Sequence, residues 1–147
     1  MKTGVYEIEE YVEQWGLFKP TTHRLNRAFL SSKKIGFTLN VCCGTDETGD
    51  VRADIVRSVK PTIMADVKCL PFRERSFDTV ICDPPYNYYN KFHWIFELTK
   101  IARKRIILST PTTLVNLGKG WFRKIFYIDT ARHFMRIWQV FTRDVLA

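Results

Sequence analysis

The sequence predicts an α/β domain whose sheet is mostly parallel and carries an antiparallel hairpin at one edge. Short apolar runs typical of strands alternate with stretches of helical period through the middle of the chain. Interleaved strands and helices favour parallel pairing, because parallel strands need crossover connections. Two aromatic-rich extended runs, 121–128 and 134–142, then predict the hairpin.

The first part of the chain, residues 1–34, is predicted to be helical. Apolar residues recur at helical spacing near its start: Val5, Ile8, Val12 and Trp15. A second helix is expected after Pro20, capped by Thr21 or Thr22 and ending near Leu30. The polar run 31–34 then predicts a loop.

Residues 35–147 are predicted to form the sheet core. Strands are expected at 38–42, 51–55, 62–65, 79–82 and 105–109. A helix is expected between the last two of these strands, where apolar residues from Phe92 to Ala102 have helical spacing. The cations Lys100, Arg103, Lys104 and Arg105 suit the end of that helix, where they complement its dipole.

Length and composition predict one domain over 1–147, with 46% hydrophobic and 26% charged residues. No run approaches the about 20 apolar residues of a membrane span, and the acidic N-terminal stretch is unlike a secretory signal. We therefore expect a cytoplasmic protein without a membrane partner. The four cysteines and three histidines lack metal-ligand spacing, so no metal site is expected.

The net charge of +8 is concentrated in the second part of the chain. Residues 1–90 hold 12 cationic and 12 acidic side chains, whereas residues 91–147 hold 11 cationic and 3 acidic ones. Such an asymmetry is typical of a polyanion-binding protein, although a solvated basic face has the same signature. A nucleic-acid partner is the favoured interpretation.

Polar residues follow the first four strands of the predicted parallel sheet. Gly44 lies in the turn after the first strand, and Asp54, Asp66 and Asp83 follow the next three. Ligands of such sheets bind beyond the carboxyl ends of the strands. Asp54 is therefore expected to accept hydrogen bonds from ribose hydroxyls, and Asp66 from an adenine amino group, while the neighbouring amide donates to the ring. The alternative is that these acids terminate strands or cap turns.

The run Asp83, Pro84, Pro85, Tyr86 must leave its strand in a stiff turn, because prolines lack an N–H and fix φ. The Asp83 carboxylate and the Pro84 carbonyl can each accept one hydrogen of a planar amino group, which leaves its nitrogen lone pair for an electrophilic methyl group. Tyr86 can stack on the base, a contact worth about 1–3 kcal/mol. A duplex base would have to flip out to reach this turn.

With this turn, the chain over 38–109 resembles the class I S-adenosylmethionine-dependent methyltransferases, in the amino-methylating branch marked by DPPY. The resemblance implies a Rossmann-like fold and S-adenosylmethionine as cofactor. With Asn87 after DPPY, the turn is especially similar to that of DNA adenine-N6 and cytosine-N4 methyltransferases. It implies catalytic roles for Asp83, Pro84, Pro85 and Tyr86, and substrate contacts for Tyr86 and Asn87. It implies cofactor contacts for Asn40, Cys42, Gly44, Asp54, Asp66 and Val67.

The chain departs from the family pattern at Asn40, where an acid is usual, and at Cys42, where the first glycine is usual. The stretch from Gly44 to Asp54 is also short for the usual helix, so the methionine end of the cofactor is expected to be held differently. Three alternatives remain: an RNA guanine-N2 or adenine-N6 methyltransferase, glutamine methylation, and a non-catalytic nucleic-acid-binding subunit. A recognition subunit or a second copy of the chain is a further possible partner.

Overall fold

A computed structural model describes residues 4–7, 10–12, 22–85, 92–110, 114–129 and 135–144. The strands are β1 (Gly4–Glu7), β2 (Glu10–Val12), β3 (Thr38–Val41), β4 (Val51–Asp54), β5 (Ile63–Met64), β6 (Phe77–Cys82), β7 (Ala102–Thr110), β8 (Trp121–Asp129) and β9 (Met135–Arg143). The helices are α1 (Thr22–Lys33) and α2 (Ile95–Ile101), with short 3₁₀ turns η1 (Arg57–Val59) and η3 (Phe92–Trp94). No helix in these ranges is long and apolar enough to cross a membrane.

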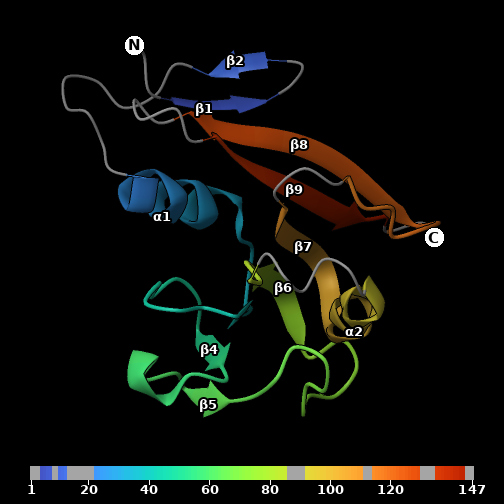
Figure 1. The fold of residues 1–147 in the computed structure, drawn as a ribbon. Helices are drawn as coiled ribbons and strands as arrows, with labels where there is room; N and C mark the ends of the chain where they lie inside the picture. Colours follow the sequence, from blue (N-terminus) through green and yellow to red (C-terminus); the bar gives the residue numbers. More distant parts are fainter. Residues whose placement is uncertain are drawn as a thin grey trace.

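The strands form one sheet in the order β2-β1-β8-β9-β7-β6-β3-β4-β5 (Figure 1). The run from β7 to β5 is parallel throughout, which confirms the α/β prediction. The hairpin of β8 and β9 is antiparallel, as predicted. Its predicted position at an edge is wrong, because β9 pairs with β7 on one side and β1 and β2 extend the sheet beyond β8.

The predicted helix over residues 5–15 is also wrong, since β1 and β2 occupy much of that segment. Ile8 and Trp15 lie outside the described residues. Val5 and Tyr6, like Tyr11 and Val12, belong to residue types that favour strands. The outer edge of β8 offers unpaired backbone groups to such a segment, and β1 pairs with it over four residues. This pairing overrides a helical period carried by four residues.

Two helix ends differ from the prediction. The helix after Pro20 continues to Lys33, so most of the expected loop at 31–34 is helical. The second helix ends at Ile101, and the Ala102 N–H donates to the Leu98 carbonyl. Residues 103–105 belong to β7 instead, because β6 and β9 flank β7 and offer backbone partners on both sides.

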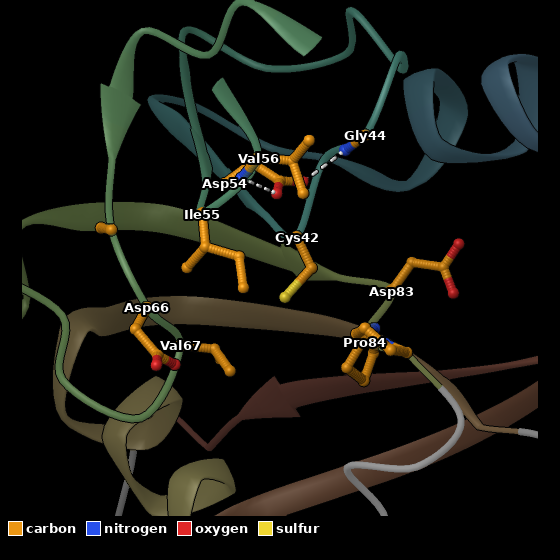
Figure 2. A pocket seen from close by; sticks show the side chains of 11 residues that line it. Cys42, Gly44, Asp54, Ile55, Val56, Asp66, Val67, Asp83 and Pro84 are labelled. Carbon is orange, nitrogen blue, oxygen red and sulfur yellow. Dashed lines mark hydrogen bonds between the residues drawn. The ribbon is translucent and has the colours of Figure 1, made fainter. Parts of the chain in front are cut away.

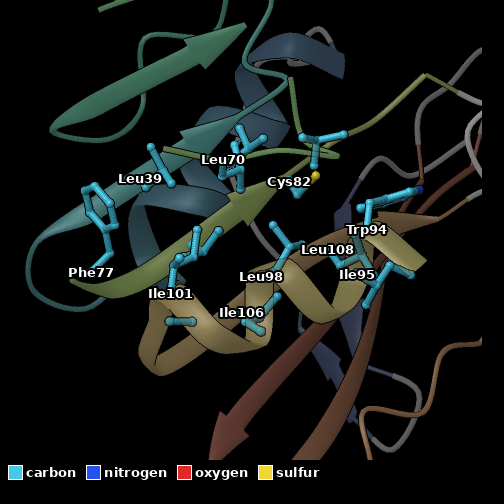
Figure 3. Close-up of a cluster of buried hydrophobic side chains, with 14 of the residues drawn as sticks. Leu39, Leu70, Phe77, Cys82, Trp94, Ile95, Leu98, Ile101, Ile106 and Leu108 are labelled. Atoms are coloured by element: carbon cyan, nitrogen blue, oxygen red, sulfur yellow. The ribbon is translucent and has the colours of Figure 1, made fainter. Parts of the chain in front are cut away.

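Among the described residues, the α-helices α1 and α2 lie on opposite faces of the sheet. Phe29 and Leu30 of α1 pack on one face, against buried residues of four strands: Ile81, Ile107, Phe126, Trp138 and Val140. Ile95, Leu98 and Ile101 of α2 pack on the opposite face in the larger cluster (Figure 3). No α-helix lies between β3 and β4 or between β4 and β5: the first connection is a loop, and the second holds only the short turn η1.

Asp78 ties the amino ends of β3 and β6 together. Its Oδ2 accepts the Phe37 N–H at 3.0 Å, and Arg103 and Lys104 lie 3.4 Å from its Oδ1. The Phe37 N–H, and then the neighbouring cations, hold the pKa of Asp78 below its ordinary value of 3.8.

We expect Asp78→Ala to lower the free energy of unfolding at pH 7 more than at pH 3. A carboxyl with a depressed pKa stabilises the fold above its unfolded pKa, and this contribution is lost as pH falls through the folded value. Urea unfolding at both pH values measures the difference. Glu74→Ala, at an exposed position in the preceding loop, is the control. An Asp78→Ala deficit that is equal at both pH values would contradict the assigned contacts.

Candidate active site

The turn after β3 has a backbone that reverses sharply at its start. Cys42 and Gly44 adopt positive φ values of 54° and 53°. A residue with a Cβ pays about 1–2 kcal/mol for this conformation, so Cys42 stands where a glycine would be less strained. Asn40, which the sequence suggested as a cofactor contact, is buried, and its Nδ2 donates to the Thr48 carbonyl at 2.9 Å. Asn40 therefore stabilises this turn by a buried hydrogen bond.

Asp54 joins the turn after β3 to the turn after β4. Its Oδ2 accepts the Gly44 N–H at 2.9 Å, and its Oδ1 accepts the Val56 N–H at 2.9 Å. Asp54 is only 9% exposed to solvent. Because each carboxylate oxygen has a second lone pair, Asp54 can still accept hydrogen bonds from a ligand in the adjoining cavity.

Arg52 is a structural residue that the sequence reasoning missed. Its guanidinium donates to the carbonyls of Asp46, Gly44 and Lys60 at 2.8, 3.1 and 3.4 Å. These bonds hold a turn that has no helix to support it. Strand alternation could have placed Arg52 on the face opposite the buried Ala53, but no motif marks it.

Asp66 forms the turn cap that the sequence left open as an alternative. Its Oδ1 accepts the Lys68 N–H at 2.9 Å, and its carbonyl accepts the Cys69 N–H at 2.9 Å. The next residue, Val67, is 1% exposed and packs in the larger core cluster. The cap fixes the backbone at Asp66 and Val67, and both residues still line the cavity in which a ligand could contact them.

Asp83, Pro84 and Pro85 follow β6 directly. Asp83 is half-buried, Pro84 is buried, and Pro85 is exposed, whereas Tyr86 and Asn87 lie outside the described residues. Burial raises the pKa of the neighbouring Cys82 thiol well above its ordinary value, and Cys42 and Asp83 add to this shift. Cys82 is therefore a neutral thiol beneath the turn.

A cavity of about 360 Å³ brings together residues from the ends of β3, β4, β5 and β6. It is lined by Cys42, Gly44, Asp54, Ile55, Val56, Ala65, Asp66, Val67, Asp83, Pro84 and Pro85. In Figure 2, the Ile55, Cys42 and Val67 side chains point toward its centre. All the described site residues predicted from the sequence line this cavity except Asn40.

A second cavity, of about 460 Å³, lies on the α1 side of the sheet. It is lined by Asn26, Leu30, Asn40, Cys42, Cys43, Gly44, Thr45, Asp46, Ile81, Asp83 and Trp138. The two cavities share Cys42, Gly44 and Asp83. The Asp83 carboxylate points away from Ile55 and Val67 of the first cavity (Figure 2). Asp83 thus stands where the two cavities meet.

The comparisons with known proteins bear on the fold. No protein-family model and no curated protein matches the chain. Among solved structures, it is similar to an S-adenosylmethionine-dependent methyltransferase from Aquifex aeolicus, with a TM-score of 0.50 and 11% sequence identity. The likeness covers 80% of this chain and 88% of that one. At this identity the likeness shows the architecture, and the chain therefore has a Rossmann-like α/β fold of the kind found in that methyltransferase.

Proposed function

We propose that the protein is an S-adenosylmethionine-dependent methyltransferase that acts on an exocyclic amino group of a nucleic-acid base. DNA adenine N6 or cytosine N4 is the favoured acceptor. The observation that carries the proposal is the position of Asp83, which lines both a cavity suited to a nucleoside and a second cavity beside it. The fold shared with a methyltransferase of that cofactor supports the same proposal.

The first cavity has the size and the polar groups for the adenosine part of the cofactor. Its volume of about 360 Å³ is within the range of small-ligand pockets. Asp54 would accept from the ribose hydroxyls, and Asp66 from the adenine amino group. Ile55 and Val67 offer apolar contacts to the ring. When bound, S-adenosylmethionine supplies an electrophilic methyl group.

The second cavity would admit the acceptor base. The Asp83 carboxylate and the Pro84 carbonyl would each accept one hydrogen of the amino group, which orients the nitrogen lone pair. The two prolines fix this geometry, because neither can rotate about φ. The Cys82 thiol, whose pKa is raised by burial, places no competing charge beneath the turn.

The turn at Cys42 favours an enzyme over a non-catalytic subunit of the same fold. The chain has Cys42 where the first glycine of the family pattern is usual, a departure that would suit a subunit that does not bind the cofactor. In the structure, Cys42 nevertheless takes the positive φ that a glycine would supply, and its side chain borders both cavities. The backbone of the turn therefore keeps the conformation that a glycine would allow, although residue 42 is a cysteine.

We expect Asp54→Asn to weaken S-adenosylmethionine binding about 10- to 100-fold, because a charged acceptor contributes about 1.5–3 kcal/mol to its hydrogen bonds. Isothermal titration calorimetry measures the affinity. Asp50→Asn is the matched control: its Oδ2 also accepts a backbone N–H, from Thr38 at 2.8 Å, but Asp50 lines neither cavity. Equal affinities for both variants would argue against the ribose role of Asp54.

Transfer of a labelled methyl group to DNA and to tRNA tests the proposed reaction. We expect the label in N6-methyldeoxyadenosine or N4-methyldeoxycytidine, identified by mass spectrometry of the digested product. Label in RNA guanine or adenine would select the RNA alternative within the same chemistry. Label confined to protein glutamine, or no binding of the cofactor, would refute the proposal.

A further inference from the structure

The second cavity is lined by one side of α1 as well as by the ends of strands. Asn26 and Leu30, four residues apart on the same side of the helix, both line it. The C-terminal end of α1 lies toward the amino ends of the parallel strands, where the Lys33 carbonyl accepts a hydrogen bond from Arg105 at 2.6 Å. The earlier part of α1, with Asn26, therefore lies over the edge that carries Asp83.

One hydrogen bond determines which way the Asn26 amide faces. The Trp138 Nε1–H donates to Asn26 Oδ1 at 3.1 Å. Because an indole nitrogen only donates, the amide atom beside it is the oxygen and not the nitrogen. Trp138 is 1% exposed, and its ring centroid lies 6.0 Å from that of Phe29, so the core holds this donor in place. The other branch of the planar amide, Nδ2, can then donate to an acceptor in the cavity.

The register of the strands places Trp138 level with Asp83. Asp83 follows Cys82, which pairs with Leu108 of β7, and Trp138 of β9 pairs with the residue after Leu108. Asp83 and Trp138 are thus two strands apart at one level, with roughly 10 Å between their backbones. Both line the second cavity. The cavity therefore has a carboxylate acceptor on its β6 side and an oriented amide donor where α1 meets β9.

The other polar side chains of this cavity provide no donor of fixed direction. Asn40 Nδ2 donates to the Thr48 carbonyl at 2.9 Å, and Asp46 Oδ1 accepts the Thr48 N–H and hydroxyl at 2.9 and 2.8 Å. Thr45 is exposed, and its hydroxyl can donate or accept. The two cysteine thiols are weak donors. Among the lining residues that the structure describes, Asn26 therefore offers the donor whose direction the core fixes.

We propose that Asn26 selects the acceptor base by donating from Nδ2 to the ring nitrogen beside the amino group. This ring nitrogen is N1 in adenine and N3 in cytosine, on the edge by which flipped bases are read. Asp83 would accept from the amino group, so the two side chains would contact one donor and one acceptor of the same base. Thymine has a carbonyl and an N–H at these positions, which would face groups of their own kind. This role rests on the proposed function, since it takes the second cavity to hold the base.

Bases in which the ring nitrogen is replaced by C–H test this contact in the full chain. 1-Deazaadenine keeps the amino group and lacks N1, whereas 7-deazaadenine keeps both; cytosine and 3-deazacytosine form the equivalent pair. We expect the wild type to bind deoxyadenosine oligomers about tenfold more tightly than their 1-deaza counterparts, the cost of leaving an amide donor unpaired. The 7-deaza oligomer should bind like adenine. Fluorescence anisotropy with S-adenosylhomocysteine present measures binding, and labelled cofactor measures transfer.

Two variants of Asn26 should abolish this preference. Asn26→Asp keeps an oxygen for the Trp138 N–H and exchanges only the donor branch, so it separates base selection from the attachment of α1. Asn26→Ala removes the amide altogether. Asn116→Asp is the matched control: Asn116 Oδ1 also accepts an N–H, from Gly118 at 2.9 Å, but Asn116 lines neither cavity. Its preference for the ring nitrogen should equal that of the wild type.

The outcomes distinguish this role of Asn26 from the proposed function. A preference for the ring nitrogen that depends on Asn26, without methyl transfer, would support the role and count against the function. Transfer or binding without that preference, or with the same preference in the Asn26 variants, would overturn the role alone. An Asn26→Asp protein that keeps the preference and loses affinity for the cofactor would assign the cavity to the methionine end instead. Neither binding nor transfer with any oligomer would refute both.

Discussion

Replacing Asp83 with alanine is expected to lower the rate of methyl transfer about 10²- to 10³-fold, the usual cost of losing one preorganised group at a reacting centre. The variant keeps Asp54 and Asp66, so its affinity for S-adenosylmethionine should stay close to that of the wild type. The loss would follow from poor orientation of the acceptor amine, because Pro84 alone then offers one acceptor in place of two. Single-turnover transfer from labelled cofactor measures the rate.

The Asp83→Asn variant separates charge from geometry. Asparagine retains one oxygen acceptor but adds an amide donor that faces the hydrogens of the amino group. We therefore expect a large loss in this variant too, whereas Asp50→Asn, outside both cavities, should transfer at the wild-type rate. Undiminished transfer by Asp83→Ala would show that Asp83 does not orient the acceptor.

The grouping of the site residues could be predicted because it follows from strand direction alone. Parallel strands end at one edge, so an acid at the end of β4 and acids that follow β5 and β6 must approach one another. Asp54, Asp66 and Asp83 do line one cavity. Their hydrogen bonds could not be predicted, since the two N–H groups that Asp54 accepts come from turns whose shape no local pattern encodes.

Secondary structure was predicted wrongly where a short helical pattern competed with strand pairing to a distant part of the chain. The spacing from Val5 to Trp15 matched a helix, but the free edge of β8 recruited β1 as a strand. Similarly, Arg103 and Lys104 looked suited to the end of a helix, yet they lie in β7 between two partner strands. The sequence shows how many cations residues 91–147 hold, but it could not show that Arg103 and Lys104 lie at the opposite end of β7 from the cavities.

Trp138→Ala is expected to destabilise the protein by about 3–5 kcal/mol, as for other buried tryptophans. Trp138 belongs to β9, is 1% exposed, and packs in one buried cluster with Phe29 and Leu30 of α1. Its ring centroid is 6.0 Å from that of Phe29, and its Nε1 donates to Asn26 Oδ1 at 3.1 Å. Trp138 therefore contributes both buried packing and a hydrogen bond to the attachment of α1.

A milder variant shows which part of the Trp138 side chain matters, and an exposed aromatic residue is the control. Trp138→Phe retains most of the buried ring and loses the bond to Asn26, so we expect a smaller cost of about 1 kcal/mol from the lost hydrogen bond, plus a cavity contribution. Phe122→Ala, at an exposed position, should change the free energy of unfolding by less than about 0.5 kcal/mol. Urea unfolding followed by circular dichroism measures all three. Trp138 and Asn26 also line the second cavity, so loosening α1 should impair methyl transfer as well as stability. A Trp138→Ala protein as stable as the wild type would contradict the assigned packing of α1.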